Sequence, residues 1–463
     1  MLYDRAMTDF QTMNDLLAVG GDDATAIGAP GTAPLTFAAQ RALAGDVVAS
    51  LNSNGIGRGD RVAIVLPNGP EMAAAFVTVA TGAVTAPLNP AYREDEFDFY
   101  LDNLKACALI VQQGDETPAR VLADRRGIPI LELIPDADGP AGMFSLSGPG
   151  GGTAAQPGLA ESGDAGLILH TSGTTSRPKM VPLSQTNICA SARHIGESLA
   201  LTADDRCLNI MPLFHIHGLI AAVLSSLAAG AGVYCTPGFN ALRFFQWMDE
   251  VAPTWYTAVP TMHQTIQTRA KRNPDSLANS KLRLIRSSSA SLPPQVMALL
   301  EETFNCPVIE AYGMTEAAHQ MASNPLPPAA RRPGCVGLAA GPEVGIMAEE
   351  SGEMLPSGEV GEIVIRGANV TDGYIENPAA NATAFTDGWF RTGDQGVIDG
   401  EDVAAAVVLC EGVEATEREL RDFVSQRLAD FKVPRKMLFL EEIPKGATGK
   451  LQRIGLAEKL GLG

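Results

Sequence analysis

The stretch His170-Thr-Ser-Gly-Thr-Thr-Ser-Arg-Pro-Lys179 holds five hydroxyl side chains, one glycine, an arginine and a lysine. It follows the apolar run Ala165-Gly-Leu-Ile-Leu169, which predicts a buried strand that leads into a loop. Gly173 lets successive backbone N–H groups turn toward one centre, as in loops that cradle phosphates. The stretch lacks the G-x-x-x-x-G-K-[ST] pattern of a Walker A loop. A serine- and threonine-rich linker is the alternative, but the preceding buried strand favours an anion-binding loop.

Helical and strand patterns alternate on both sides of this loop. Residues 36–52 carry apolar side chains at helical spacing, and residues 61–66 form an apolar strand pattern. Further helices and strands are expected at 71–83, 84–88, 97–104, 108–112 and 119–125. A second block of this kind runs over residues 186–310, and the glycine-rich residues 336–366 are more typical of antiparallel strands. The pattern predicts an α/β fold with largely parallel sheets.

The composition limits the size, the partners and the compartment. A chain of 463 residues exceeds the roughly 250–300 residues at which a single core stops growing, so we expect two domains. The net charge of −19 argues against binding to nucleic acid or to an anionic membrane. No apolar run reaches the roughly 18 residues that a membrane span needs. The seven cysteines are scattered and the N-terminus has no signal-peptide pattern, which favours free thiols and a cytoplasmic location.

Five motifs, in a fixed order, give the chain a family resemblance. They are Thr171-Ser-Gly-Thr-Thr-Ser-Arg-Pro-Lys179, Pro212-Leu-Phe-His215, Tyr312-Gly-Met-Thr-Glu316, Gly388-Trp-Phe-Arg-Thr-Gly-Asp394 and Gly446-Ala-Thr-Gly-Lys450. From about Leu35 to Arg453 the chain resembles the adenylate-forming superfamily of acyl-CoA synthetases, luciferases and peptide-synthetase adenylation domains. The resemblance implies a large N-terminal domain over residues 1–394, with two α/β sheet subdomains and a small β-barrel. It also implies a smaller α+β lid domain over residues 395–463.

This C-terminal domain is shorter than that of the family which the chain resembles. There, a hinge, a basic hairpin, a helix and a strand follow the Arg-Thr-Gly-Asp motif. Here Arg391-Thr-Gly-Asp-Gln-Gly-Val-Ile-Asp-Gly400 leads directly into the strand pattern of residues 401–409. A helix at 416–429, a strand at 436–440 and the Lys450 loop complete the domain. Roughly the first half is missing, so we expect a truncated lobe with a thin core.

The resemblance assigns several residues to ATP. The signature loop would hold the β- and γ-phosphates, and Tyr312 would stack on adenine, although a core tyrosine is the alternative. Asp394 would accept hydrogen bonds from the ribose hydroxyls, and Glu316 would be an oxygen ligand of Mg²⁺. The nucleotide-binding residues are then Thr171, Ser172, Gly173, Thr174, Thr175, Lys179, Ser289, Ala290, Tyr312 and Asp394.

Acyl-adenylate formation brings two anions together, so catalysis consists mostly of charge stabilisation and alignment. The resemblance makes Lys450 the mobile catalytic lysine and adds Thr315 and His215 as catalytic residues. His215 occupies the gate position beside the carboxylate pocket. The pair His215-x-His217 lacks a third ligand at the spacing of a zinc site, so zinc is not expected there.

The residues after Glu316 line the acyl pocket in the family which the chain resembles. Relatives that activate bulky aryl acids place small apolar residues here, whereas this chain has His319 and Gln320. The substrate-binding candidates are therefore His215, His319 and Gln320. The last two would make a short polar pocket, and a second carboxylate on the substrate would explain them. The stretch 310–328 resembles the oxalate–CoA ligase branch closely. The alternative is that His319 packs against the sheet.

These observations predict an ATP-dependent acid–CoA ligase that uses ATP, Mg²⁺ and CoA and acts through an acyl-adenylate. Its acid would be oxalate or another small polar carboxylic acid, and the shortened lobe would impair turnover. Two alternatives stay open: an adenylation enzyme that loads a carrier protein, and a nucleotide-binding protein without full turnover. Pyrophosphate exchange and dependence on CoA separate the three. The sequence leaves the acid and the oligomeric state open.

Overall fold

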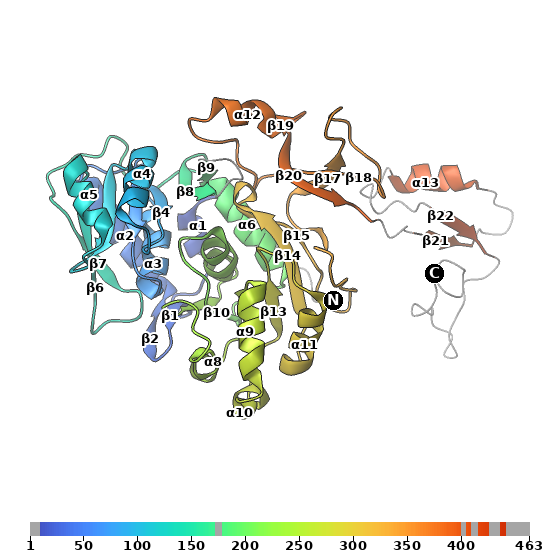
Figure 1. Ribbon diagram of the computed structural model, residues 1–463, viewed down its shortest axis with the longest axis horizontal. Helices are drawn as coiled ribbons and strands as arrows, with labels where there is room; N and C mark the ends of the chain where they lie inside the picture. Colours follow the sequence, from blue (N-terminus) through green and yellow to red (C-terminus); the bar gives the residue numbers. More distant parts are fainter. Residues whose placement is uncertain (1–9, 172–177, 400–403, 409–414, 426–435, 441–463) are drawn as a thin grey trace. The chain divides into compact units, whose positions relative to one another are not determined.

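The computed structural model of the chain describes residues 10–171, 178–399, 404–408, 415–425 and 436–440 (Figure 1). The chain divides into two compact units. The first comprises residues 1–345 and 363–394, and the second comprises residues 346–362 and 395–463. In the part of the chain that is described, no helix is both long and apolar enough to cross a bilayer.

The first sheet of the larger unit has seven strands in the order β7-β6-β5-β3-β4-β8-β9. The strands are β3 (Arg61–Val65), β4 (Val84–Pro87), β5 (Ala108–Gln112), β6 (Ile130–Pro135), β7 (Phe144–Ser147), β8 (Ala165–Thr171) and β9 (Lys179–Ser184). The five inner strands run parallel to one another, and β7 and β9 are antiparallel edges. The alternating sequence pattern therefore gives the parallel sheet that it predicts.

Helices cover both faces of this sheet because its inner strands are apolar on both sides. The helices are α2 (Phe37–Ser53), α3 (Pro70–Val79), α4 (Glu94–Leu104) and α5 (Pro118–Arg126), each within three residues of its predicted start and four of its predicted end. Val62 and Ile64 belong to the core cluster with α2 and α3. Ala63 and Val65 point the other way and join α4 and α5. Alternation along one strand thus places one helix pair on each face.

The second sheet of the larger unit has nine strands in the order β16-β15-β14-β13-β12-β10-β11-β1-β2. The strands are β1 (Thr25–Ala29), β2 (Thr32–Thr36), β10 (Arg206–Asn209), β11 (Gly232–Cys235), β12 (Trp255–Ala258), β13 (Leu284–Ser287), β14 (Val308–Met314), β15 (His319–Ser323) and β16 (Leu338–Ala339). Strands β1, β11, β10, β12, β13 and β14 are parallel to one another. Strand β2 is antiparallel to β1, β15 is antiparallel to β14, and β16 is antiparallel to β15. Strands β10 to β13 and the start of β14 come from the second α/β block that the sequence predicts, residues 186–310, whereas β1, β2, β15 and β16 join the sheet from outside it.

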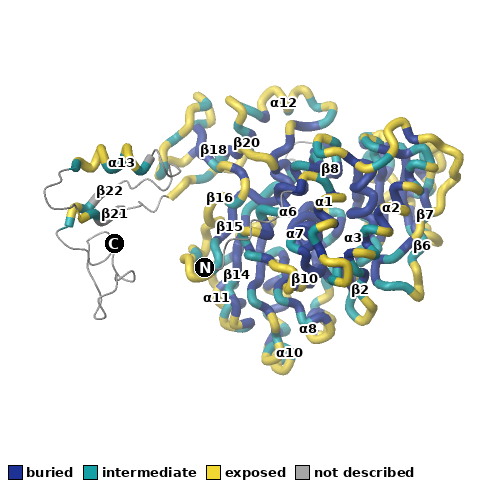
Figure 2. Tube along the Cα trace, turned by 180° about the vertical axis from the view of Figure 1, so that it is seen from behind, coloured by how far each residue is buried: buried dark blue, intermediate teal, exposed yellow. Residues whose placement is uncertain are grey.

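The two sheets share one layer of helices. Helix α3, helix α6 (Gln185–Ser198) and the π-helix η1 (His217–Leu224) contact strands of both sheets or each other, and Figure 2 shows this region as buried. Helices α8 (Phe244–Val251), α9 (Pro260–Ala270) and α11 (Pro294–Phe304) pack on the outer face of the nine-stranded sheet. The shorter helices are α1 (Met13–Leu17), α7 (Ser225–Ala228), α10 (Pro274–Ala278), α12 (Pro378–Ala384) and the 3₁₀ turn η2 (Thr315–Ala317).

A smaller sheet takes the place of the expected barrel. Its four strands lie in the order β17-β18-β20-β19. They are β17 (Glu343–Met347), β18 (Val360–Arg366), β19 (Phe385–Thr386) and β20 (Trp389–Val397). The predicted antiparallel stretch 336–366 therefore contributes to two sheets, because β16 joins the nine-stranded one.

The second unit contains the three elements that the sequence predicts beyond residue 400. Strand β21 (Ala404–Val407) pairs in parallel with β22 (Lys436–Phe439), and helix α13 (Glu417–Ser425) lies between them in the sequence. The end of the predicted helix and the Lys450 loop lie outside the described residues. A two-stranded sheet with one helix is a small core for an independent lobe.

Candidate active site

The carboxyl ends of three parallel strands meet at one edge of the nine-stranded sheet. Thr257 of β12 pairs with Arg286 of β13, which in turn pairs with Ile309 of β14. In open α/β sheets, ligands bind outside the carboxyl ends of the strands. The predicted residues Ser289, Ala290, Tyr312, Thr315 and Glu316 lie at or just beyond the carboxyl ends of β13 and β14, so this edge is the candidate active site.

Tyr312 and Asp394 lie together although they are far apart in the sequence. The Tyr312 hydroxyl donates a hydrogen bond to the Asp394 carboxylate. Burial and the neighbouring Asp394 raise the pKa of Tyr312, so the phenol stays protonated and remains a donor. The structure thus brings together the residues expected to contact adenine and ribose. Ser289 and Ala290 are exposed on the loop after β13, and Ser289 has a φ of 70°.

The signature loop is held by an antiparallel hairpin. Thr171 at the end of β8 pairs with Lys179 at the start of β9. Ser172, Gly173, Thr174 and Thr175 lie outside the described residues. The Lys179 ammonium lies over the ring of Tyr374, 4.6 Å from its centroid. The hairpin therefore fixes both ends of the loop, and Tyr374 contacts the lysine that closes it.

Glu316 is a buried carboxylate at the same edge. Its side chain lies on η2, next to Thr315, and its Oε1 accepts a hydrogen bond of 2.9 Å from the Tyr374 hydroxyl. Burial raises the pKa of Glu316, while the nearby Lys179 acts in the opposite direction. Among the described residues, no three histidine, cysteine or acidic side chains converge as a metal cluster. Glu316 is thus a buried oxygen donor that lies near both Lys179 and Asp394.

Arg286 is a fully buried arginine that our sequence analysis missed. Its Nη1 donates to His319 Nε2 at 3.2 Å, and its Nη2 donates to Gln320 Oε1 at 3.1 Å. Within the described part of the chain its Nε has no hydrogen-bond partner, and no carboxylate pairs with it. Burial lowers the pKa of Arg286 to about 9. A buried cation without a counter-ion is costly, which marks this guanidinium as a binding group for an anion.

A buried histidine pair lies beside this guanidinium. Since a guanidinium can only donate, His319 Nε2 accepts, and the His319 ring is neutral with its proton on Nδ1. The His319 ring stacks on His217, with centroids 4.9 Å apart. His217 forms hydrogen bonds with Thr257 Oγ1 at 2.6 Å and Ser289 Oγ at 2.9 Å. Burial is the main cause that lowers the pKa of both histidines well below the ordinary value.

The backbone at His319 is strained. Its φ is 103°, and that of Ala318 is 46°, a region which side-chain-bearing residues rarely adopt. Gly313 permits this turn, because a Cβ at that position would lie 1.5 Å from the His319 carbonyl oxygen. The strain places His319 beside Arg286, and strained residues of this kind gather at functional sites.

Gln320 is saturated by protein partners. Its Nε2 donates to Ser198 Oγ at 3.0 Å and to the Ala340 carbonyl at 3.1 Å, while its Oε1 accepts from Arg286. The side chain is fully buried. This arrangement holds the guanidinium in place rather than offering free polar atoms to a ligand.

The remaining catalytic candidates differ in position. His215 is exposed on the loop between β10 and η1, and it is close enough to His319 to contribute to its lowered pKa, after burial and Arg286. Thr315 is half-buried at the start of η2. Lys450 lies outside the described residues.

Three residues of the site were missed by sequence reasoning. Arg286 interrupts the strand Leu284-Ile-Arg-Ser287, all of which is buried, and a charged residue in such a strand is a usable signal. His217 was considered only for zinc. Tyr374 carries no local signal, because its role depends on a contact across the fold.

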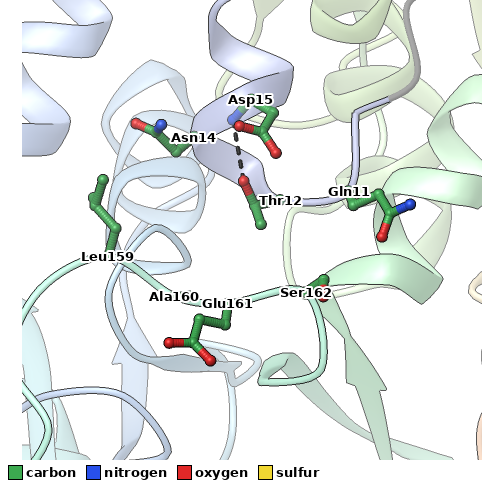
Figure 3. Close-up of a pocket in the computed structure, with 8 residues that line it drawn as sticks. All are labelled: Gln11, Thr12, Asn14, Asp15, Leu159, Ala160, Glu161 and Ser162. Atoms are coloured by element: carbon green, nitrogen blue, oxygen red, sulfur yellow. Dashed lines mark hydrogen bonds between the residues drawn. The ribbon is translucent and has the colours of Figure 1, made fainter.

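A separate hollow of about 590 Å³ lies on another part of the larger unit (Figure 3). It is open to solvent and lined by residues of the α1 region and of the stretch 159–162, with Thr12 capping α1 through the Asp15 amide. None of the site residues lines it. We therefore assign no part of the chemistry to it.

Known families and solved structures are similar to this chain over most of its length. Residues 18–375 match the AMP-binding enzyme family, and residues 392–450 match the AMP-binding enzyme C-terminal domain. The chain is 26% identical to the ATP-bound structure of MatB from Rhodopseudomonas palustris, with a TM-score of 0.73 over 97% of this chain and 98% of that one.

Curated relatives cover most of the chain. The oxalate–CoA ligase of Arabidopsis thaliana is 38% identical, with 86% of this chain and 88% of the relative aligned. The oxalate–CoA ligase of Saccharomyces cerevisiae is also 38% identical, with 87% of each chain aligned. The latter alignment is 476 positions long, more than the 463 residues of this chain, so this chain lacks residues that the yeast relative has.

Proposed function

Since the chain belongs to the AMP-binding enzyme family, we propose that it is an AMP-forming acid–CoA ligase for oxalate or another small polar acid. The observation that carries the choice of acid is Arg286, buried at the site without a counter-ion among the described residues. The similarity to two oxalate–CoA ligases supports the same choice.

The second carboxylate of a short diacid would compensate the charge of Arg286. A fatty or aryl tail would instead leave the guanidinium buried and unpaired, at a free-energy cost of several kcal/mol. His319 would offer its Nδ1–H to the same carboxylate, since its Nε2 is already used by Arg286. Gln320, Thr257 and Ser289 would keep this end of the pocket in place.

The reaction proceeds in two balanced steps. One carboxylate oxygen of the acid forms a bond to the α-phosphorus of ATP, and the bond to pyrophosphate breaks. The thiol of CoA then attacks the acyl carbon, AMP leaves with the bonding electron pair, and the thiol proton goes to solvent. Both steps bring negative groups together, so cationic side chains do most of the stabilisation.

Each nucleotide-binding residue has a distinct part in this proposal. Tyr312 would stack on adenine, and Asp394, which accepts a hydrogen bond from the Tyr312 hydroxyl, would accept from the ribose hydroxyls. Lys179 would contact the phosphates, and Lys450 would neutralise charge between carboxylate and α-phosphate. Glu316 fits Mg²⁺ as a buried oxygen donor, and Mg²⁺ would neutralise the phosphate charge when bound.

The shortened C-terminal lobe favours a second candidate. The alignment with the yeast relative is longer than this chain, which supports a deletion without locating it. If the deletion removes the hinge, as the motif spacing predicts, the lid would close poorly. A nucleotide-binding protein without full turnover is therefore the alternative, followed by a carrier-protein-loading enzyme.

We propose that the protein is located in the cytoplasm. The proposal rests on the cysteines, which are scattered along the sequence, and the six that the structure describes are free thiols.

An acid panel tests the proposal. AMP release is measured with oxalate, malonate, acetate and a long-chain acid, each with and without CoA. We expect oxalate to be preferred. Arg286→Met should lower kcat/KM for oxalate by roughly a hundredfold, because a paired charge is lost, and should change the value for acetate by less than about threefold. For Arg286→Lys, kcat/KM for oxalate should lie between the values of the original chain and of Arg286→Met. Equal losses with both acids, or a preference for long chains, would refute the choice of acid.

A further inference from the structure

Tyr374 touches both charged residues that the proposed function assigns to the metal and the phosphates. Its hydroxyl donates to Glu316 Oε1 at 2.9 Å, and the Lys179 ammonium lies 4.6 Å from its ring centroid. We infer that Tyr374 is a positioning residue that holds Glu316 and Lys179 ready for a complex of Mg²⁺ with a nucleoside triphosphate. The inference rests on the proposed function.

The segment around Tyr374 is pinned to both partners. The Thr371 amide donates to the Glu316 carbonyl at 2.8 Å. The Thr371 hydroxyl donates to the Pro182 carbonyl at 2.7 Å, and the Ile375 amide donates to the Met180 carbonyl at 3.1 Å. Both carbonyls belong to β9, which begins at Lys179. One short segment therefore ties the metal-binding candidate to the strand that carries the phosphate-binding lysine.

Asn381 immobilises Tyr374 itself. Its Oδ1 accepts from the Tyr374 amide at 2.8 Å, and its Nδ2 donates to the Tyr374 carbonyl at 2.9 Å. Tyr374 is only 8% exposed. The phenol ring therefore has a fixed place between the two charged groups.

A neutral tyrosine leaves both charges free for a ligand. In the described part of the chain, neither Glu316 nor Lys179 forms an ion pair. Had they paired directly, a ligand would first have to break a largely buried ion pair, which costs several kcal/mol. The hydroxyl and the ring face of Tyr374 instead supply one weaker contact to each. The carboxylate can then exchange this contact for a cation, and the ammonium can exchange it for phosphate oxygens.

Two variants at one position separate the two contacts. Tyr374→Phe keeps the ring under Lys179 and removes only the hydroxyl. Tyr374→Leu removes both contacts. Tyr256→Phe is the matched control, because it removes a buried hydroxyl that bonds His263, away from Glu316 and Lys179. ATP binding to the full chain is measured by calorimetry with Mg²⁺ and with a chelator, and the unfolding temperature confirms that each variant is folded.

The expected pattern depends on the metal. In Tyr374→Phe, the gain in ATP affinity that Mg²⁺ provides should fall roughly tenfold, while metal-free affinity stays within about twofold. In Tyr374→Leu, affinity should fall both with and without Mg²⁺. The ATP affinity of the control Tyr256→Phe should equal that of the original chain, both with and without Mg²⁺.

Two results would overturn the inference, and they are distinguishable from each other. An unchanged Mg²⁺ gain in folded Tyr374→Phe, with normal binding by the original chain, refutes the positioning role alone. Failure of the original chain to bind ATP with Mg²⁺ refutes the proposed function and the inference together.

Discussion

The imidazole rings of His217 and His319 are stacked, with centroids 4.9 Å apart and planes inclined by 25°. His217 comes from the π-helix between the sheets, and His319 comes from the strained start of β15. Both side chains are buried at 1% exposure or less. The pair therefore forms a neutral wall next to the Arg286 guanidinium, and protonation of either ring would place a second cation there.

Acidification should destabilise the folded chain through its buried histidines. Burial lowers the pKa of His217 and His319 well below the ordinary value and that of His263 to about 4. The unfolded chain therefore binds more protons below about pH 6.5, and each histidine should remove up to about 1.4 kcal/mol of unfolding free energy per pH unit. Urea unfolding at pH 7, 6 and 5 measures this.

His263 offers a control for that experiment because it lies outside the candidate site. His263→Phe should reduce the fall in unfolding free energy between pH 6.5 and pH 5 by about a sixth, since it removes one of six histidines that all have a lowered pKa in the folded chain. An unfolding free energy that is constant from pH 7 to pH 5 in the original chain would contradict the prediction.

His319→Ala should discriminate between acids. With oxalate, loss of the imidazole leaves the second carboxylate and Arg286 without a shared partner, so kcat/KM should fall by roughly tenfold to a hundredfold. With acetate the fall should be several times smaller. Steady-state AMP release gives kcat/KM with each acid. Equal losses with oxalate and acetate would mean that His319 only packs against the sheet and does not contact the substrate.

Gly313→Ala should disturb the site through the backbone. The new Cβ would lie 1.5 Å from the His319 carbonyl oxygen, so β14 and β15 must move apart. We expect a loss of about 1–3 kcal/mol in unfolding free energy and a loss of oxalate turnover. Gly45→Ala is the control, because no atom lies within 4 Å of its Cβ and alanine favours helix α2 by about 1 kcal/mol. Similar unfolding curves for the two variants would refute the argument.

The two lysines should separate binding from catalysis. Lys179→Ala should weaken ATP binding, since Lys179 lies at the end of the signature hairpin. Lys450→Ala should leave ATP binding near normal and reduce adenylation. Calorimetry and pyrophosphate exchange on both variants test this, and identical behaviour of the two would show that the assignment of roles is wrong.

The sequence was sufficient for the fold because its signals are local. The alternation of apolar strands and amphipathic helices predicted β3 to β5 and α2 to α5 with small shifts at their ends. The motif order also predicted the family, and the match over residues 18–375 confirms it.

The same reasoning was weaker for the acid pocket. His319 and Gln320 were found from their place after Glu316, but Arg286 was not, although it contacts both. Its partners lie on another strand, more than thirty positions away in the sequence. Tyr374 was missed for the same reason, since its contacts to Glu316 and Lys179 arise only when a segment near residue 374 folds against β9. Contacts between distant segments leave no periodic pattern.

If the C-terminal unit lacks the hinge and hairpin, as the motif spacing predicts, the two half-reactions should be affected unequally. Beyond residue 400, the described part of this unit contains β21, β22 and α13, which give Lys450 a small support. Adenylation should therefore be slow, and thioester formation slower still, because a lid that serves both steps needs a hinge and two intact faces. Formation of oxalyl-adenylate is measured by pyrophosphate exchange, and formation of oxalyl-CoA is measured by chromatography under the same conditions. If the Arabidopsis relative has additional residues at the position of Gly400, insertion of that segment should restore CoA-ester formation more than pyrophosphate exchange. CoA ester formed by the original chain at a rate typical of complete enzymes, roughly 1–10³ per second, would show that the missing segment is dispensable.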